Sequence, residues 1–250
     1  MFMSFPLSGN PLLETAGQSH LSKVNSYIKR LAATRGIRYN MLRMLQYYPL
    51  CTISLESINA AVGAIDTAAF KLINGSLARP WLDGIMVIAT TFGVGTVQAG
   101  LSLGLVLFGL VKDKVNVRRA GYAGLIAFAA SGVAVQVAKF IWHRPRPLLA
   151  LFDVHLVDVP RFTHSFPSGH SMTAFAVAVA ISIFLPRLRY ILIPIALATG
   201  LSRIYLGVHY PLDVTFGAFV GVLIGILSAR QIQPLNTDKS SDEELVSANG

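Results

Sequence analysis

The sequence has 250 residues, of which 53% are hydrophobic and only 13% are charged. Soluble domains carry about 25% charged residues, so this composition excludes an ordinary soluble protein and predicts an integral membrane protein. The formal net charge is +9, but most basic residues flank long apolar runs, which indicates membrane topology and not nucleic-acid binding. Because Cys51 is the only cysteine, an internal disulfide and a cysteine-ligated metal cluster are also excluded.

The first 46 residues are polar and basic, and we interpret them as an extension outside the membrane domain. Residues 25–46 are expected to form a basic amphipathic helix on a lipid surface or to be loosely ordered. Residues 47–82 mix charged and apolar side chains, and the apolar ones recur at helical spacing, which predicts an amphipathic interfacial helix. These apolar residues are Ile58, Val62, Ile65, Ala69 and Leu72.

Five long apolar runs follow, and a bilayer span needs roughly 17 to 25 such residues. The first run is long enough to begin with a short helix, and Gly93 and Gly95 mark its expected break. Small side chains within the runs favour close helix–helix contact in lipid. The runs are residues 81–111, 120–142, 168–185, 190–205 and 211–229, and the small side chains include Gly100, Gly104, Ala127, Ala130, Ser131 and Gly132.

The predicted fold is therefore all-α: a multi-pass membrane helical bundle with about five transmembrane helices plus interfacial helices, over residues 47–230. Residues 231–250 are polar and acidic, which predicts a disordered tail. Basic residues at 112–119, 187–189 and 230 fall on one face of the bundle, and that face should be cytoplasmic. The connections 139–167 and 202–213 then lie on the extracytoplasmic side of the cell (inner) membrane.

One feature opposes this orientation, because five spans would place the basic N-terminal extension on the outer face. A sixth crossing near residues 47–72 would resolve the conflict, but it would bury Glu56 and Asp66. A central Asp costs about 2.5–3.5 kcal/mol in a spanning helix. We therefore predict five spans, with six as the alternative.

Three clusters of polar residues lie at the outer ends of the predicted spans, so they can converge on one pocket. In the second cluster, a proline, a serine, a glycine and a histidine directly precede an apolar run, which is typical of a helix start. Ser168 can cap this helix and Gly169 lets the backbone approach a ligand. The clusters comprise Lys139, Arg146 and Pro147; Pro167, Ser168, Gly169 and His170; and Ser202, Arg203, His209 and Asp213.

The chemistry that these residue types indicate is phosphoryl transfer. Lys139, Arg146 and Arg203 supply three positive charges, and guanidinium groups match phosphate oxygens bidentately. Ser168 and the first free N–H groups of the helix, at Gly169 and the next residue, complete an anion cage. Such a cage stabilises the charge that develops on the phosphoryl oxygens in the transition state.

Two histidines divide the catalytic work in this hypothesis. Asp213 follows His209 by four residues across a helix start at Pro211, so its carboxylate can hold one imidazole tautomer. His209 is therefore the candidate nucleophile, and His170 is the candidate general acid. A zinc site built from these residues is disfavoured, because three nearby cations would repel a divalent ion. The alternative without catalysis is that Ser168 only caps a membrane helix and His170 is an interfacial polar residue.

Other polar and aromatic residues of the outer connections are given structural interpretations. Arg144 can contact a second phosphate, but a solvated loop charge is the preferred interpretation. Trp142 and Tyr190 are expected in the interfacial belt, and Tyr205 and Tyr210 are expected to pack near His209 without catalysing. The remaining polar residues of these connections are His143, Arg161 and His164.

The three clusters resemble the signature of the type 2 phosphatidic acid phosphatase superfamily, K-x6-R-P, P-S-G-H and S-R-x5-H-x3-D. Every signature position matches in residue type and spacing, and the resemblance covers about residues 66–229. It implies a helical-bundle core shared with vanadium haloperoxidases and a phosphatase without metal or other cofactor. It also implies His209 as nucleophile with Asp213 as its partner, His170 as acid, and phosphate ligands at Lys139, Arg146, Ser168, Gly169 and Arg203.

The size and simple core look most like bacterial members that act on lipid phosphates. The leading hypothesis is hydrolysis of undecaprenyl diphosphate to undecaprenyl phosphate on the extracytoplasmic face, with membrane lipids and no nucleic acid as partners. Alternatives are a phosphatase for phosphatidylglycerophosphate, phosphatidic acid or lipid A, and a lipid phosphotransferase that uses the same site. A haloperoxidase is disfavoured by the apolar spans, and a transporter or structural bundle would not need His209. The oligomeric state is not indicated.

Overall fold

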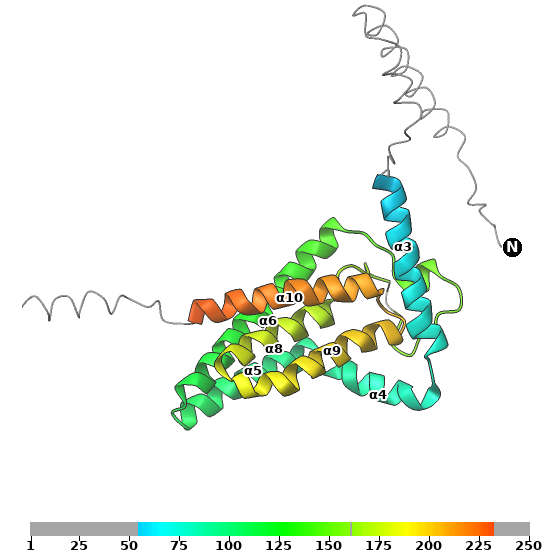
Figure 1. Cartoon of the computed structure of the whole chain (residues 1–250). Helices are drawn as coiled ribbons and strands as arrows, with labels where there is room; N and C mark the ends of the chain where they lie inside the picture. Colours follow the sequence, from blue (N-terminus) through cyan, green and yellow to red (C-terminus); the bar gives the residue numbers. More distant parts are fainter. Residues whose placement is uncertain (1–54, 161, 233–250) are drawn as a thin grey trace, which may run out of the picture. The chain divides into compact units, whose positions relative to one another are not determined.

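The computed structural model describes residues 55–160 and 162–232. Residues 1–54, Arg161 and residues 233–250 lie outside it, and so do the predicted N-terminal extension, its amphipathic helix at 25–46 and nearly all of the acidic tail. The described part of the chain is helical and contains no β-strand (Figure 1). The prediction of an all-α fold is confirmed.

Each of the five predicted apolar runs forms helix. The first run breaks at Gly93, as expected, into two helices that are bent by 51° relative to each other. The helices are α3 (Leu55–Lys71), which continues into a π-helical turn (Leu72–Ser76), α4 (Pro80–Thr91), α5 (Gly95–Val111), α6 (Val115–Ile141), α7 (Pro147–Ala150), α8 (Gly169–Phe184), α9 (Arg189–Tyr205), preceded by a 3-10 turn (Pro186–Leu188), and α10 (Pro211–Ile232).

Within the described residues, three helical segments are long and apolar enough to cross a membrane: α6, α9 with its preceding turn, and α10. The bent pair of α4 and α5 adds a fourth if it is counted as one span. The remaining predicted span, α8, is apolar but has only 16 residues. Since a span needs about 20 residues, α8 is shorter than a full span, and its surroundings show how the bundle accommodates it.

Helix α8 is the centre of the bundle, and α5, α6, α9 and α10 pack around it (Figure 1). Ten of its residues are buried, and most of them are small. Ala176 and Ala180 of α8 meet Ala120, Ala123 and Ala127 of α6 in a core of fully buried alanines. Because protein surrounds this helix on most sides, it does not need to match the bilayer thickness by itself.

The closest helix–helix contact is made by a row of glycines on α10. A Cβ atom at Gly217, Gly221 or Gly225 would lie 2.3–2.7 Å from a backbone oxygen of α8 or of its N-cap residue Ser168, so only glycine fits there. The predicted small-residue contacts are thus only partly right. Ala127 and Ser131 are buried, whereas Gly100, Gly104 and Gly132 have open space beside them, because they lie on helix faces that no other described helix covers.

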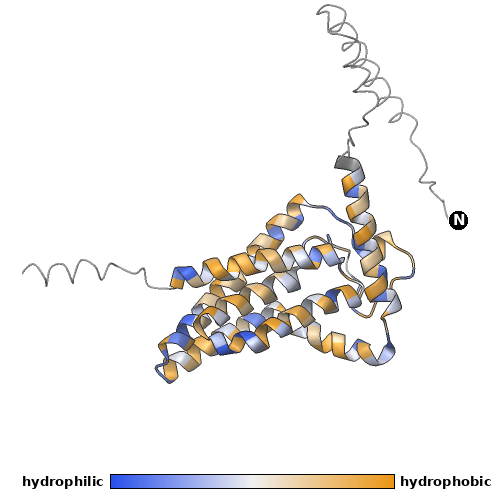
Figure 2. Ribbon diagram, in the orientation of Figure 1, coloured by the Kyte–Doolittle hydropathy of each residue, from blue (hydrophilic) through white to orange (hydrophobic). Residues whose placement is uncertain are grey.

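The outer surface of the bundle is apolar. Large side chains such as Leu107, Phe108, Val133, Phe219 and Leu227 are each more than half exposed. The hydropathy colouring in Figure 2 shows hydrophobic residues along the outer faces of the long helices and hydrophilic residues at the helix ends. Water would penalise so much exposed apolar surface, whereas lipid does not. This surface identifies the chain as a membrane protein.

Helix α3 is amphipathic, but its apolar stripe is exposed and the face that carries Asp66 is buried. The predicted apolar stripe is exposed, with Ile65 at 70% exposure. The opposite face, with Asp66, Phe70 and Asn74 at four-residue spacing, is buried against the loops that precede α8 and α10. By length and composition α3 is not among the candidate spans. The apolar stripe of α3 faces outward, and its interfacial position stays a prediction.

Candidate active site

The polar clusters predicted from the sequence lie at the same end of the bundle. They stand at the end of α6, the start of α8, the end of α9 and the start of α10. The connection between α6 and α8 links them. Within it, Thr163, His164 and Ser165 contact Arg146, Lys139 and Asp213 respectively. These three consecutive residues thus tie the first cluster to the third.

Arg146 is held rigidly beside His209. The arginine is 3% exposed, its Nε donates to the carbonyl of Thr163 at 2.9 Å and its Nη1 donates to the carbonyl of Val208 at 2.9 Å. The same Nη1 lies 3.4 Å from Nε2 of His209. A guanidinium so fixed presents its charge where an anion would meet the imidazole.

His209 and Asp213 face each other, as the sequence predicts. Nδ1 of His209 lies 3.7 Å from Oδ2 of Asp213, and both side chains are buried. This distance exceeds a hydrogen bond but is typical of catalytic pairs that tighten when substrate binds. With the proton on Nδ1, toward the carboxylate, Nε2 keeps its lone pair on the side of Arg146.

Burial lowers the pKa of His209 from its usual 6.5 to about 4. The imidazolium form loses its hydration inside the protein, and the charges of Arg146 and Arg203 also disfavour it, while Asp213 offsets part of the effect. The imidazole is therefore neutral at physiological pH. A neutral ring is the form that can attack as a nucleophile.

The start of α8 is built as predicted in position but not in every bond. Ser168 occupies the N-cap position, yet its hydroxyl makes no capping bond to the helix. It accepts a hydrogen bond from Ser171 Oγ at 3.1 Å instead, and its backbone N–H donates to the carbonyl of Asp213 at 3.0 Å. Gly169 is the first helical residue, so the first N–H groups of α8 point out of the helix end.

His170 lies on the same turn, under the bend between α4 and α5. A Cβ atom at Gly93 would come within 3.0 Å of the His170 Cβ and within 2.4 Å of the Thr199 side chain. Only a glycine therefore allows the chain to pass so close above His170. The sequence signal at Gly93 marked a helix break, and the structure adds that this break covers a candidate catalytic residue.

Lys139 and Arg203 complete the predicted set of cations. Lys139, in the last turn of α6, donates from Nζ to the carbonyl of His164 at 3.1 Å. Arg203, in the last turn of α9, is 1% exposed. Its Nη1 donates to Thr90 Oγ1 at 2.6 Å, and its Nη2 lies 3.1 Å from Asp158 Oδ2. The positive charge of Arg203 contributes to the lowered pKa of His209.

The interpretation of Arg144 as a solvated loop charge is wrong. Its Nη1 donates to Asp213 Oδ1 at 2.7 Å and its Nη2 to Asp66 Oδ2 at 2.5 Å. Its guanidinium also lies 4.0 Å from the centre of the Tyr210 ring. The sequence could not reveal these bonds, because the partners are 69 and 78 residues away along the chain.

Ser165 is a site residue that the sequence reasoning missed. It is fully buried, and its hydroxyl donates to Asp213 Oδ2 at 2.5 Å. The hydroxyl oxygen of Ser165 also lies 3.4 Å from His209 Nδ1. It therefore stands between the carboxylate and the imidazole. Its position five residues before His170, in the same connection as the second cluster, was the available signal.

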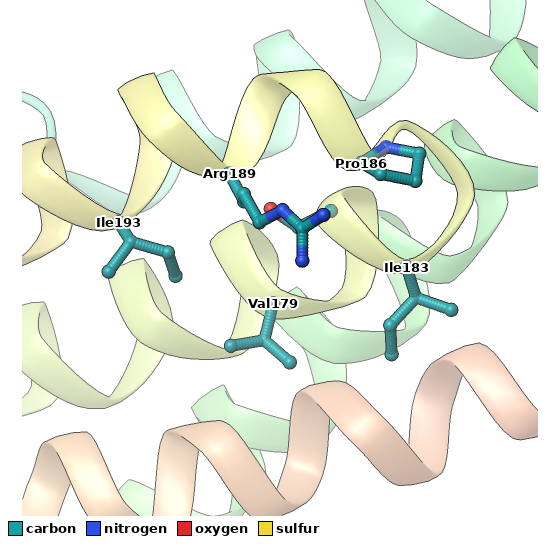
Figure 3. A pocket seen from close by; sticks show the side chains of 6 residues that line it. Val179, Ile183, Pro186, Arg189 and Ile193 are labelled. Carbon is teal, nitrogen blue, oxygen red and sulfur yellow. The ribbon is translucent and has the colours of Figure 1, made fainter.

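Cavities on the described part of the bundle differ in chemistry. One, of about 430 Å³, lies between the end of α8 and the start of α9, at the opposite end from the polar clusters. Figure 3 shows its apolar walls at Val179, Ile183 and Ile193, with Arg189 extending between them. A second, of about 480 Å³, is lined by Lys139, His143, Thr163 and His164, among others, and so adjoins the site.

The third cavity is an apolar groove of about 620 Å³ between α6 and α10. Trp142, Phe216 and Met172 are among its lining residues, and Met172 lies one helical turn after Ser168 on α8. Trp142 is also 57% exposed, and its place in the interfacial belt stays a prediction. The groove thus leads along the outside of the bundle to the end where the polar clusters lie.

Comparison with known proteins supports one assignment. Residues 121–236 match the PAP2 superfamily. The chain is 33% identical to undecaprenyl-diphosphatase BcrC of Bacillus subtilis over 64% of this chain and 81% of the relative. It is 30% identical to an undecaprenyl-diphosphatase of Sulfolobus acidocaldarius over 70% of this chain and 82% of the relative.

A solved structure gives the same result. The chain resembles the PAP2-type phosphatidylglycerolphosphate phosphatase from Bacillus subtilis with a TM-score of 0.57 and 28% identity, over 74% of this chain and 92% of the other. Residues 121–236, which match the family, contain the three polar clusters predicted from the sequence. The chain therefore belongs to the PAP2 superfamily and is a membrane phosphatase.

Proposed function

We propose that the chain hydrolyses a lipid phosphate or diphosphate through a phosphohistidine at His209, with undecaprenyl diphosphate as the preferred substrate. One observation carries the catalytic part of the proposal: Nε2 of His209 faces Nη1 of Arg146 at 3.4 Å, while Nδ1 faces Asp213 at 3.7 Å. A phosphoryl group held by the arginine meets the lone pair of Nε2, and the carboxylate stabilises the positive charge that the ring acquires.

In the first step, Nε2 of His209 attacks phosphorus and the bond to the leaving oxygen breaks. His170 donates its proton to that oxygen, which departs as the lipid alcohol or the lipid phosphate. Lys139, Arg146 and Arg203, with Ser168 and the free N–H groups at Gly169, bind the phosphoryl oxygens. These charges neutralise the transition state without rearrangement, and such preorganised donors are each worth about 10² to 10³ in rate.

In the second step, water attacks the phosphohistidine. His170, now neutral, takes a proton from the water, the N–P bond breaks, and inorganic phosphate leaves with the imidazole of His209 restored. The low pKa of His209 supports this sequence, because the free enzyme holds the ring neutral and ready for attack.

The lipid part of the proposal rests on the membrane surface and on the relatives. The groove between α6 and α10 is lined almost entirely by apolar side chains and reaches Met172, next to the start of α8. It suits the apolar chain of a lipid whose phosphate lies in the cage. Both curated relatives described above are undecaprenyl-diphosphatases, which favours the diphosphate, and the solved neighbour makes phosphatidylglycerophosphate the main alternative.

Phosphate release from purified protein in detergent tests the substrate. The panel contains undecaprenyl diphosphate, phosphatidylglycerophosphate, phosphatidic acid and lipid A, with His209→Ala as the control. We expect the highest kcat/KM with undecaprenyl diphosphate and no turnover by the control. A preference for another lipid would replace the substrate, activity only with an acceptor lipid would indicate a phosphotransferase, and a fully active His209→Ala variant would refute the mechanism.

The same assay tests the metal-free chemistry, because three cations already supply the charge that a divalent ion would bring. EDTA should leave the rate unchanged, and a loss that added zinc restores would overturn this part.

For the side of the membrane, a cysteine placed in residues 148–158 should react with an impermeant reagent in intact cells. Reaction only after lysis would place the site in the cytoplasm.

A further inference from the structure

Asp66 is a carboxylate that the proposed mechanism does not use, and it is 2% exposed. It belongs to α3, outside the region matched to the family at residues 121–236. Its Oδ2 accepts from Arg144 at 2.5 Å, and its Oδ1 accepts from the backbone N–H of Leu212 at 2.8 Å. A buried carboxylate is costly unless it is paired in this way, so its position calls for a reason other than stability.

Arg144 connects this carboxylate to the proposed catalytic pair. One of its terminal nitrogens donates to Asp66 and the other to Asp213, at 2.5 and 2.7 Å. The guanidinium also lies against the face of Tyr210, which restricts its rotation. A planar fork can bridge two carboxylates in fixed geometry, whereas a lysine ammonium is a point charge.

The bonds to Asp213 divide its two oxygens between different tasks. Oδ2, which faces His209, accepts from Ser165 at 2.5 Å and from the backbone N–H of Tyr210 at 2.9 Å. Oδ1 accepts from Arg144. Arg144 therefore fixes the rotation of the carboxylate about its Cβ–Cγ bond, and Asp66 in turn fixes Arg144 from the other side.

We infer that Arg144 and Asp66 are positioning residues of the active site: Asp66 orients Arg144, and Arg144 sets both the orientation of Asp213 and the negative charge that it presents to His209. The inference rests on the proposed function, because it assumes that Asp213 assists His209. It extends the catalytic machinery to α3, a helix that carries none of the signature residues.

The charges make the inference testable by sign. Asp66, Arg144 and Asp213 together carry a net charge of −1. Removing the arginine charge leaves −2 beside His209 and should raise its pKa, whereas removing the Asp66 charge leaves 0 and should lower it. The other charged or titratable groups described around the pair, Arg146 and Arg203 from the adjoining cluster and Tyr210 from the loop, stay unchanged.

The measurement is the pH dependence of kcat/KM for phosphate release, since its acidic limb reports the base of the free enzyme. We expect Arg144→Gln to move this limb to higher pH and Asp66→Asn to move it to lower pH, each by about half a pH unit to one unit. Titration of the lipid phosphate contributes equally to every variant, so the differences belong to the protein. The double variant restores the net charge of −1, and its limb should return toward that of the wild type.

Arg144→Lys separates charge from geometry. It keeps the positive charge, so the acidic limb should stay in place, but it cannot bridge both carboxylates and kcat should fall about tenfold with little change in KM. If Arg144→Gln does not fold, the pair of Asp66→Asn and Arg144→Lys decides the question alone. Arg187→Gln and Asp113→Asn, exposed charge changes at the opposite end of the bundle, should alter neither limb nor rate.

A purely structural role predicts a different result. The variants would then unfold at lower temperature, while the folded fraction kept the wild-type kcat and limb. Unshifted limbs, or limbs that both move in one direction, would overturn the inference. Failure of the proposed function is recognised separately, because an active His209→Ala variant contradicts it whatever the Arg144 and Asp66 variants do.

Discussion

The two ends of the bundle are both rich in arginine, but they hold it in different ways. At the end formed by the α8–α9 turn, Arg187 and Arg189 are exposed, and Arg189 lies over the ring of Tyr190 at 5.3 Å. At the other end Arg146 and Arg203 are 3% and 1% exposed. Arg146 donates hydrogen bonds to the carbonyls of Thr163 and Val208. Arg203 donates to Thr90 Oγ1 and pairs with Asp158.

This difference in burial distinguishes arginines suited to setting membrane topology from arginines suited to binding an anion. Exposed arginines in water are screened and mobile, and the prediction from the sequence is that they set the orientation of the chain in the membrane. Buried arginines have lost their hydration, so their charge acts at full strength on whatever anion enters. The cavity in Figure 3 contains an arginine and has a volume of about 430 Å³. Among the described residues that line it there is no histidine to attack phosphorus and no second cation to bind its oxygens.

The largest expected effect tests this contrast directly. Arg146→Lys and Arg203→Lys keep the charge but lose the rigid fork that binds phosphate oxygens. We expect kcat/KM for phosphate release to fall by about 10² to 10³ in each, as when a preorganised donor to a transition state is removed.

The matched controls are Arg187→Lys and Arg189→Lys at the other end. Both should retain wild-type kcat/KM, since their side chains are exposed and distant from the polar clusters. Equal losses at the two ends would show that the contrast between fixed and exposed arginines is without functional meaning.

A second effect, of about 3 kcal/mol, concerns stability and pH. The folded protein holds His209 with a pKa of about 4 against 6.5 when exposed, so the unfolded chain binds more protons between these values. The contribution of the neutral histidine is fully present above pH 6.5 and is lost as pH falls toward 4. Unfolding temperature in detergent should therefore fall over this window in the wild type.

In His209→Gln that part of the pH dependence should disappear, and the variant should gain relative to the wild type as the pH falls from 6.5 to 4. A parallel decline of His209→Gln and wild type would mean that burial does not hold the ring neutral.

The sequence predicted the helices well because each apolar run is long and continuous. All five runs became helix, and the break at Gly93 was correct because glycines interrupt an otherwise unbroken run. The length of α8 as a span was overestimated, since a run of apolar residues does not show whether lipid or protein will surround it. Here protein does, through the alanine core and the glycines of α10.

The proposed site was predictable as far as its residues fall in short motifs. His209 and Asp213 were paired correctly, because four residues across a helix start bring two side chains together. Asp66 was judged only as a cost to burial, and Arg144 as a solvated loop charge or a contact to a second phosphate. Their bond joins residues 78 positions apart, and no local pattern in one sequence records such a contact.

A third effect, of about 1–3 kcal/mol, tests the packing that carries the site. In Gly221→Ala the new methyl group would lie 2.3 Å from the carbonyl oxygen of Met172, so α10 must move away from α8. We expect a lower unfolding temperature and weaker activity, since α10 carries Asp213. Gly100→Ala, where the structure shows open space, should be neutral, and an equal loss there would contradict the close contact.

The smallest effect concerns two buried serines, one at each end. Ser165 donates to Asp213 at 2.5 Å, whereas Ser228, 3% exposed, lies near the far end of α10. Ser165→Ala removes one of the two donors on the oxygen that faces His209, and a hydrogen bond to a charged group is worth about 1.5 kcal/mol, so kcat should fall about tenfold. Ser228→Ala should leave kcat unchanged. If both variants kept full activity, Arg144 and the Tyr210 backbone would suffice to hold the carboxylate of Asp213. Residues 163–165 would then support the site only through the hydrogen bonds that Thr163 and His164 accept from Arg146 and Lys139.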